Sequence, residues 1–202
     1  MLEEKITYFE EPGKNNTEET LKLAIEKAKS RGIKKIILAS TRGDTARLAA
    51  ERLAGTGITM VVIPHQYGFG PSQRFPSELI RTLEQQGHCV HFGTMLFHTD
   101  NLYDMKSPTL IATLLRTFCQ GMKVCVEMTL MAVDGGRVAT GEQIVVVAGT
   151  GRGADTATVI TAASSRELTN LHVTEIICKP LQTIQRNPTP APTEVRPSQQ
   201  TN

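Results

Sequence analysis

The sequence contains no tryptophan, and aromatic residues make up only 4% of its 202 residues. Side chains on which unpaired bases could stack are therefore scarce. The 22 Lys and Arg residues are nearly balanced by 20 Asp and Glu residues, and they are scattered rather than gathered into a basic stripe. Both shortages argue against a nucleic-acid partner.

Long hydrophobic runs are also missing, since none approaches the roughly 20 residues that span a bilayer. Residues 1–5 read MLEEK, which is not the start of a signal peptide. No Cys-x-x-Cys spacing occurs among the four cysteines, which lie in apolar runs: Cys89, Cys119, Cys125 and Cys178. Buried free thiols suit a reducing compartment. We therefore expect a cytoplasmic protein with no membrane partner.

Familiar catalytic motifs are absent as well. There is no Walker lysine motif, no His-Glu-x-x-His motif and no Gly-x-Ser-x-Gly motif. His88 and His91 are three residues apart on a predicted strand, so they point to opposite faces and make a poor metal pair. The sequence thus predicts no metal site and assigns no catalytic residue.

What the chain does have is an alternation of strand-like and helix-like segments. Strands are predicted at 6–9, 33–39, 58–63, 89–92, 123–128 and 144–148, and helices at 16–31, 45–53, 76–86 and 107–120. Asn16 and Glu19 have the spacing of a capping box. Such alternation indicates βαβ units. The strands predicted at 158–161 and 172–178 have no helix between them. We therefore predict a three-layer α/β fold whose mainly parallel sheet has an antiparallel edge.

The composition changes near the C-terminus. Residues 1–185 are predicted to form a single domain. Residues 186–202 contain four prolines and almost nothing apolar. Such a segment cannot bury enough surface to offset its ordering entropy, so we expect a disordered Pro/Thr-rich tail.

Polar and glycine-rich residues follow the predicted strands, while the segments before the strands are short and plain. In a parallel sheet the carboxyl ends of the strands meet at one edge, where open α/β sheets bind ligands. The loop after the strand 33–39 has the chemistry of a phosphate cradle, because small residues, hydroxyl groups and a helix N-terminus coincide there. Its members are Ser40, Thr41, Arg42, Gly43 and Thr45. A helix N-cap by Asp44 or Thr45, and nothing more, remains the alternative.

A second candidate loop follows the strand 144–148. Its alternate glycines expose backbone donors, and Arg152 could pair with a phosphate. The residues are Gly149, Thr150, Gly151, Arg152 and Gly153, with Asp155 beyond them. The spacing is not that of a dinucleotide fingerprint, and a tight turn between strands is the plainer interpretation.

Other residues of the same edge complete the predicted site. Tyr67 and Phe69 could flank a planar ring or simply hold their loop against the body. Glu127 could act as an acid or base or serve as a paired carboxylate. His65 and His98, in these loops, could contact a ligand or lie at the surface. The remaining predicted contacts are His65, Gln66 and Thr94.

Two stretches carry a family resemblance. Residues 36–46, IILASTRGDTA, resemble the first strand, phosphate loop and helix of the pyruvate kinase C-terminal domain, and residues 141–149, GEQIVVVAG, resemble a later strand and its loop. Together with residues 8–10, 12–13, 16–17 and 149–157, the chain is similar over about residues 5–180 to the stand-alone family of such domains in archaea and bacteria.

The resemblance implies a phosphate site in the 40–45 loop and flavin mononucleotide (FMN) in the cleft. Arg42 and Asp44 depart from the pyruvate kinase loop, which puts regulation by fructose bisphosphate in doubt. A pyruvate kinase barrel alone needs about 250 residues, so we expect no pyruvate kinase activity. We therefore expect binding of a phosphorylated small molecule, with FMN as the expected ligand. A flavin-dependent oxidoreductase and a ligand-free regulatory subunit are the alternatives, and a homo-oligomer stays open.

Overall fold

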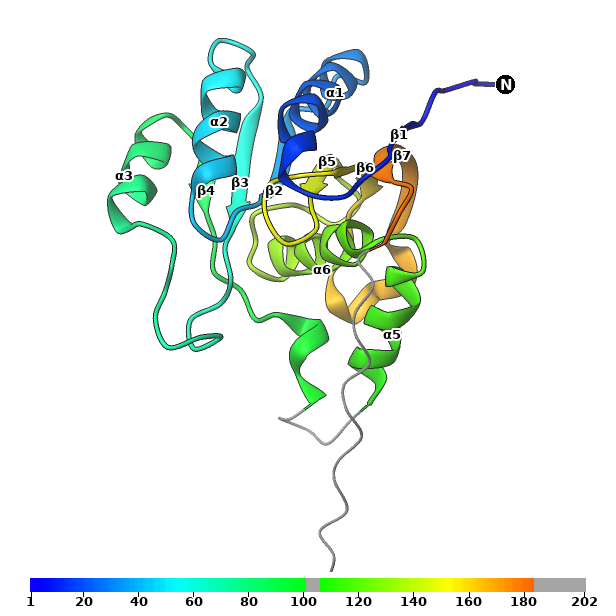
Figure 1. Ribbon diagram of the computed structural model, residues 1–202. Coiled ribbons are helices and arrows are strands. Elements are labelled where there is room, and N and C mark those ends of the chain that lie inside the picture. The colour runs from blue at the N-terminus through cyan, green and yellow to red at the C-terminus, as the bar shows by residue number, and fades with distance from the viewer. Residues whose placement is uncertain (101–105, 184–202) are drawn as a thin grey trace, which may run out of the picture.

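A seven-stranded sheet forms the centre of the protein, with the strand order β1-β7-β6-β5-β2-β3-β4 (Figure 1). The computed structural model describes residues 1–100 and 106–183, so the tail predicted at 186–202 lies outside the described residues. The strands are β1 (Thr7–Phe9), β2 (Lys35–Ala39), β3 (Thr59–Ile63), β4 (Cys89–Val90), β5 (Gln143–Ala148), β6 (Thr156–Thr161) and β7 (His172–Pro180).

Helices cover both faces of this sheet. They are α1 (Thr17–Ser30), α2 (Asp44–Leu53), α3 (Ser77–Gln85), α5 (Ser107–Arg116) and α6 (Gln120–Asp134), with short 3₁₀ turns η1 (Lys14–Asn16), η2 (Leu96–His98) and η3 (Ser165–Asn170). Within the described residues, no helix is both long and apolar enough to cross a membrane. In Figure 1, α1, α2 and α3 lie on one side of the sheet and α5 and α6 on the other.

Alternation along the strands explains the three layers. Ile36 and Leu38 of β2 pack into the core shared with α1, α2 and α3, whereas Ile37 between them packs into the core shared with α6. Successive strand residues point to opposite faces, so a strand covered on both faces is apolar throughout. The predicted three-layer α/β fold is confirmed.

The sheet is mainly parallel, as predicted. β2 pairs in parallel with β3 and with β5, and β3 pairs in parallel with β4. β6 runs antiparallel to both β5 and β7, and β7 pairs in parallel with β1. The antiparallel element at this edge region is therefore β6, a single reversed strand with two further strands outside it.

The predicted strand at 123–128 is wrong, because these residues lie inside α6. This helix packs between the sheet and α5, and it is buried on nearly every side: Met122, Cys125, Met128 and Met131 are among its buried residues. A helix buried all round loses the 3.6-residue alternation of apolar and polar positions. Its apolar run then resembles a buried strand in sequence.

Smaller corrections concern the ends of elements. The capping box at Asn16 and Glu19 does not form; the Asn16 side chain donates instead to the carbonyl of Glu11 at 2.7 Å. The strand predicted at 89–92 ends at Val90, and the helix predicted at 107–120 ends at Arg116. The four cysteines are free, as predicted, although Cys89 is only half-buried.

The strand order reverses between β2 and β5. From β2 the chain proceeds outward through β3 and β4, and it then returns to the other side of β2 to begin β5, β6 and β7. The loops that follow β2 and β5 therefore leave adjacent strand ends on either side of a crevice. Open α/β sheets bind ligands at this topological switch point.

Candidate functional site

Two adjoining pockets form a cleft at the carboxyl ends of β2, β3 and β5. The first, here called the loop pocket, has a volume of about 590 Å³ and is lined by the loops after β2 and β5. The second, here called the aromatic pocket, has a volume of about 830 Å³ and lies towards α5 and α6. Thr41, His65, Gln120 and Val124 line both pockets, so the two are continuous. Each volume lies in the range of roughly 300–1,000 Å³ seen for small-molecule sites.

The loop after β2 presents unpaired backbone donors. The N–H of Ser40 bonds to the Ile63 carbonyl at 3.4 Å, and the N–H of Ala46 bonds to Ser40 Oγ at 3.3 Å. Between them, the N–H groups of residues 41–45 donate to no group in the described part of the chain. Successive free N–H groups that lead into a helix N-terminus attract anions.

Gly43 gives this loop its shape. Its φ of +91° lies in the left-handed region, and a Cβ there would come within 2.4 Å of Leu79 Cδ2 on α3. Only glycine meets both conditions without strain. The loop can therefore pack closely against α3 just ahead of the first turn of α2.

The loop after β5 forms the facing wall of the loop pocket. Gly151 and Gly153 have φ values of +77° and +71°. Among residues 1–100 and 106–183, neither of their N–H groups finds an acceptor. A Cβ at Gly153 would lie 2.2 Å from Thr17 Oγ1 and 2.6 Å from Lys14 Cα, so this loop closes tightly onto the start of α1.

Asp155 holds this wall in place and is fully buried. Its Oδ2 accepts the N–H of Gly13 at 2.8 Å and the N–H of Thr150 at 3.1 Å, while Oδ1 accepts the Thr156 hydroxyl at 2.8 Å. Charged acceptors make stronger hydrogen bonds than neutral ones. The carboxylate thus joins the segment after β1, the loop after β5 and the first residue of β6.

Side chains add positive charge to the loop pocket. Lys14, Arg42 and Arg152 line it, and Asp44 is the carboxylate among the lining residues. Thr45 also lines the pocket, and its hydroxyl makes no hydrogen bond with any described residue. The pocket therefore combines a cationic excess with backbone and hydroxyl donors, which is the chemistry that binds phosphate.

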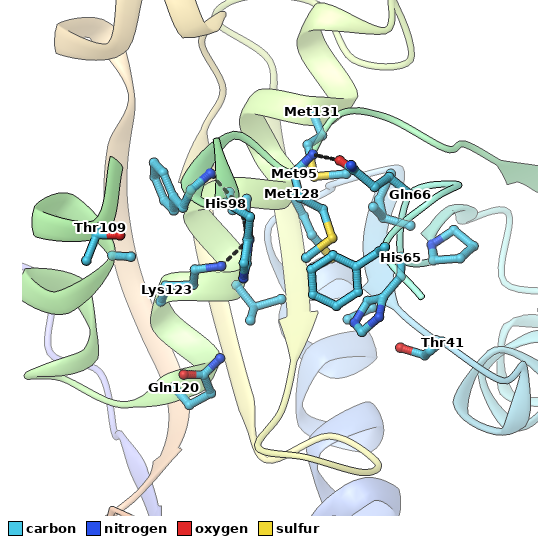
Figure 2. A pocket seen from close by; sticks show the side chains of 18 of the residues that line it. Thr41, His65, Gln66, Met95, His98, Thr109, Gln120, Lys123, Met128 and Met131 are labelled. Atoms are coloured by element: carbon cyan, nitrogen blue, oxygen red, sulfur yellow. Dashed lines mark hydrogen bonds and ion pairs between the residues drawn. The ribbon is translucent and has the colours of Figure 1, made fainter. Parts of the chain in front are cut away.

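The aromatic pocket is lined by polar and apolar side chains in similar measure. Figure 2 shows Met95 and Met128 in its centre, with Lys123 and Gln120 on one side and Gln66 and His65 on the other. Phe69 packs edge-on against His65 at 4.7 Å and against His98 at 5.3 Å between ring centroids. Gln66 Oε1 accepts the N–H of Met95 at 2.6 Å, which leaves its amide nitrogen as a donor.

A buried ion pair lies at the floor of the aromatic pocket. Lys123 is 1% exposed and donates to Glu127 Oε2 one helical turn along α6. Glu127 Oε1 also accepts the N–H of Phe97 at 2.8 Å and lies 3.2 Å from His98 Nδ1. Burial raises the pKa of Glu127, but the hydrogen bond from His98 and the charge of Lys123 outweigh it and hold the pKa below its usual range. Glu127 is therefore an anion at neutral pH.

His65 is held neutral by its surroundings. Burial and the guanidinium of Arg74, whose Nη2 lies 3.4 Å from Nδ1, lower the pKa of His65. The ring between the two pockets is therefore an uncharged hydrogen-bonding group at pH 7. No cluster of three or more His, Cys, Asp and Glu side chains in the described ranges could hold a metal ion.

The structure brings most of the predicted site residues into the cleft. Those that line it are Ser40, Thr41, Arg42, Thr45, His65, Gln66, Phe69, Glu127, Gly149, Gly151, Arg152 and Gly153. The others do not line either pocket. Gly43, Thr150 and Asp155 are buried behind the loops, Thr94 is exposed outside the cleft, and Tyr67 packs against Phe92 at 4.8 Å.

Sequence reasoning missed several lining residues. Lys14 and Thr17 follow β1, so the rule that carboxyl ends share one edge could have placed them beside the other loops. Lys123 was missed because residues 123–128 were predicted as a strand. Side chains four residues apart, such as Lys123 and Glu127, lie next to each other only in a helix. His98 was named from the sequence as a possible contact and does line the aromatic pocket, although no local pattern links it to Glu127.

One family model and several solved structures are similar to this chain. The model of the family "Pyruvate kinase, alpha/beta domain" matches residues 18–160, from α1 to β6. Among solved structures, a pyruvate kinase from Cryptosporidium parvum is similar at 17% identity and a TM-score of 0.41, covering 73% of this chain and 23% of its own. The pyruvate kinase of that organism in complex with ADP matches at 16% identity and a TM-score of 0.41, covering 73% of this chain and 24% of its own. This chain therefore spans about a quarter of the length of these proteins.

Replacing Asp155 tests the role of its carboxylate. Asp155→Asn puts an amide group against donors that now bond to a carboxylate, so each lost bond should cost about 1.5–3 kcal/mol of unfolding free energy. Amide exchange at Gly13 and Thr150 should also accelerate. The matched control is Asp134→Asn, whose carboxylate accepts the exposed Ser165 N–H at 2.9 Å and should change stability by less than about 0.5 kcal/mol. Equal stability of the two variants in urea unfolding would contradict this role.

The buried pair predicts a pH-dependent loss of stability. Lys123→Met leaves the Glu127 carboxylate buried without its cation and should cost about 3–5 kcal/mol at pH 7. The folded-state pKa of Glu127 lies below the ordinary 4.5. The ion pair therefore contributes its full stabilisation to the wild type above pH 4.5, and this stabilisation is lost as the pH falls through the folded-state pKa. The difference in unfolding free energy between Lys123→Met and the wild type should therefore be smaller at pH 4 than at pH 7.

Urea unfolding at pH 7 and pH 4 measures this gap. Lys22→Met serves as the control, because Lys22 pairs with Glu19 at the surface and its loss should cost at most about 1 kcal/mol at either pH. A gap that is unchanged or wider at pH 4 would show that Glu127 does not carry the effect.

Proposed function

The chain belongs to the pyruvate kinase alpha/beta domain family, and from this premise we propose that its cleft binds a phosphorylated small molecule, with FMN as the ligand. The proposal assigns the phosphate to the loop pocket and the ring to the aromatic pocket. It assigns no pyruvate kinase chemistry to this chain.

The observation that carries the proposal is the set of unpaired backbone donors in the two loops that line the loop pocket. The N–H groups of residues 41–45 in the loop after β2, and those of Gly151 and Gly153 in the loop after β5, have no acceptor among the described residues. Buried or half-buried backbone donors normally find a partner. A phosphate supplies several acceptor oxygens and two negative charges, which match these donors and the cations Lys14, Arg42 and Arg152.

The adjoining aromatic pocket supports a ligand that carries a ring. Met95, Met128, Met131 and Phe97 give it apolar walls, and His65 and Gln66 offer hydrogen bonds at its rim. A flexible chain joins the phosphate of FMN to a planar ring with an apolar body and a polar edge. The loop pocket suits the phosphate end of FMN, and the adjoining aromatic pocket suits its ring. Residues such as Thr41 line both pockets, so one molecule could occupy the two together.

A flavin-dependent oxidoreductase is a second candidate, favoured by one observation. The buried Lys123–Glu127 pair and His98 line the pocket assigned to the ring. Charges beside a flavin tune its reactivity, while the chemistry belongs to the cofactor. Reduction of the bound flavin by a nicotinamide nucleotide at a rate above that of free FMN would support this candidate.

Titration with FMN and riboflavin tests the binding proposal. FMN should bind with the absorbance changes of an enclosed flavin, and riboflavin, which lacks the phosphate, should bind at least tenfold more weakly. Thr45→Ala removes a hydroxyl that lines the loop pocket and should cost roughly 1.5–3 kcal/mol of binding free energy. Ser40→Ala should weaken binding similarly, with an added loss of stability because Ser40 Oγ accepts the N–H of Ala46.

The matched control is Thr45→Ser, which keeps the hydroxyl and should keep most of the affinity. Equal affinities for FMN and riboflavin, or unchanged FMN affinity in both alanine variants by calorimetry, would contradict the assignment of the phosphate to this loop. No binding of FMN at all, with tight binding of another phosphorylated compound, would retain the phosphate site and exclude the flavin.

A further inference from the structure

The outer face of α5 carries an exposed apolar row. Leu110, Leu114 and Phe118 lie four residues apart and are 70%, 64% and 51% exposed. Four-residue spacing places these side chains one above the other on one face of the helix and the turn that continues it. Isolated exposed leucines are ordinary, but an aligned row of this kind marks an interaction surface.

The opposite face of α5 is already occupied. Ala112 is buried in a small core with Phe97, Val126 and Leu130, and Ile111 and Leu115 pack beside it. Thr109 and Arg116 line the aromatic pocket. The helix therefore has one face committed to the domain, and its outer row does not take part in the domain core.

We propose that the row Leu110–Leu114–Phe118 pairs with the same row of a second copy of this chain, with the two α5 helices antiparallel about a two-fold axis at Leu114. The row is symmetric about Leu114, so the axis brings Leu114 against itself and Leu110 against Phe118 of the other copy. A two-fold interface must be self-complementary in this way. The antiparallel arrangement also places the N-terminal end of each helix dipole beside the C-terminal end of its neighbour.

Charge favours a second copy over a different protein. The residues around the row are Thr113 and Thr117, and the pairing sets neither Lys106 nor Arg116 against its own counterpart. The three residues of the row and the two threonines beside it carry no charge, so they can meet their own copies without like-charge repulsion, whereas folded heterologous partners are normally selected by complementary charge. The chain's own residues 184–202 are rich in proline and polar residues and offer no comparable apolar row.

The size of the surface indicates a weak dimer. A helix of ten residues is about 15 Å long, so a pair of such helices buries less than the roughly 1,600 Å² of a standard interface. Sedimentation velocity of the full chain over a wide concentration range should therefore show a monomer–dimer equilibrium. Leu114→Glu places two carboxylates at the axis and should weaken association by at least about tenfold.

Cysteine cross-linking tests the symmetry. Helices packed 8–10 Å apart bring Cα atoms that face each other across the axis within disulfide range, so Leu114→Cys should form a disulfide-linked dimer. Thr113→Cys, one residue away on the same exposed helix, should cross-link much more slowly. A chain that stays monomeric at every concentration, or equal cross-linking of the two variants, would overturn the proposal. FMN titration of Leu114→Glu keeps this result separate from ligand binding, since neither outcome depends on the other.

Discussion

The buried carboxylate of Asp155 is the constraint on which the cleft depends. It joins Gly13 ahead of α1, Thr150 in the loop after β5, and Thr156 at the start of β6. The bonds to Gly13 and Thr150 draw two segments from opposite ends of the sequence together. The carboxylate accepts the N–H of Thr150, while the N–H groups of Gly151 and Gly153 in the same loop have no acceptor among the described residues. A structural anion thus shapes the wall of a site suited to a ligand anion.

Topology supplies the other wall. The reversal of strand order at β2 and β5 separates the loops that follow them, and Gly43 allows the β2 loop to pack on α3 with its donors free. The aromatic pocket exists because the chain then crosses to the other face through η2, α5 and α6. That crossing buries Lys123 and Glu127 beside the cleft. The same excursion leaves the outer row of α5 exposed.

Much of this arrangement could be predicted from the sequence, and the failures have physical causes. The strands β2, β3 and β5 and the helices α1, α2 and α3 have clear apolar patterns and glycine ends, and the carboxyl-end rule then placed the 40–45 and 149–153 loops together. Residues 123–128 were misassigned because burial on all sides removes helical periodicity. The pairing of Glu127 with His98, and the burial of Asp155 behind its loop, depend on contacts between distant segments that no local pattern encodes.

The proposed phosphate site depends on the unpaired backbone donors of the two facing loops. Amide nitrogen–proton correlation spectra of the labelled chain, recorded during titration with FMN, test it most directly. The largest shifts should fall on the amides of residues 41–45, Gly151 and Gly153, and riboflavin at the same concentration should leave these amides nearly unmoved. Shifts centred elsewhere, or the same shifts with riboflavin, would contradict it.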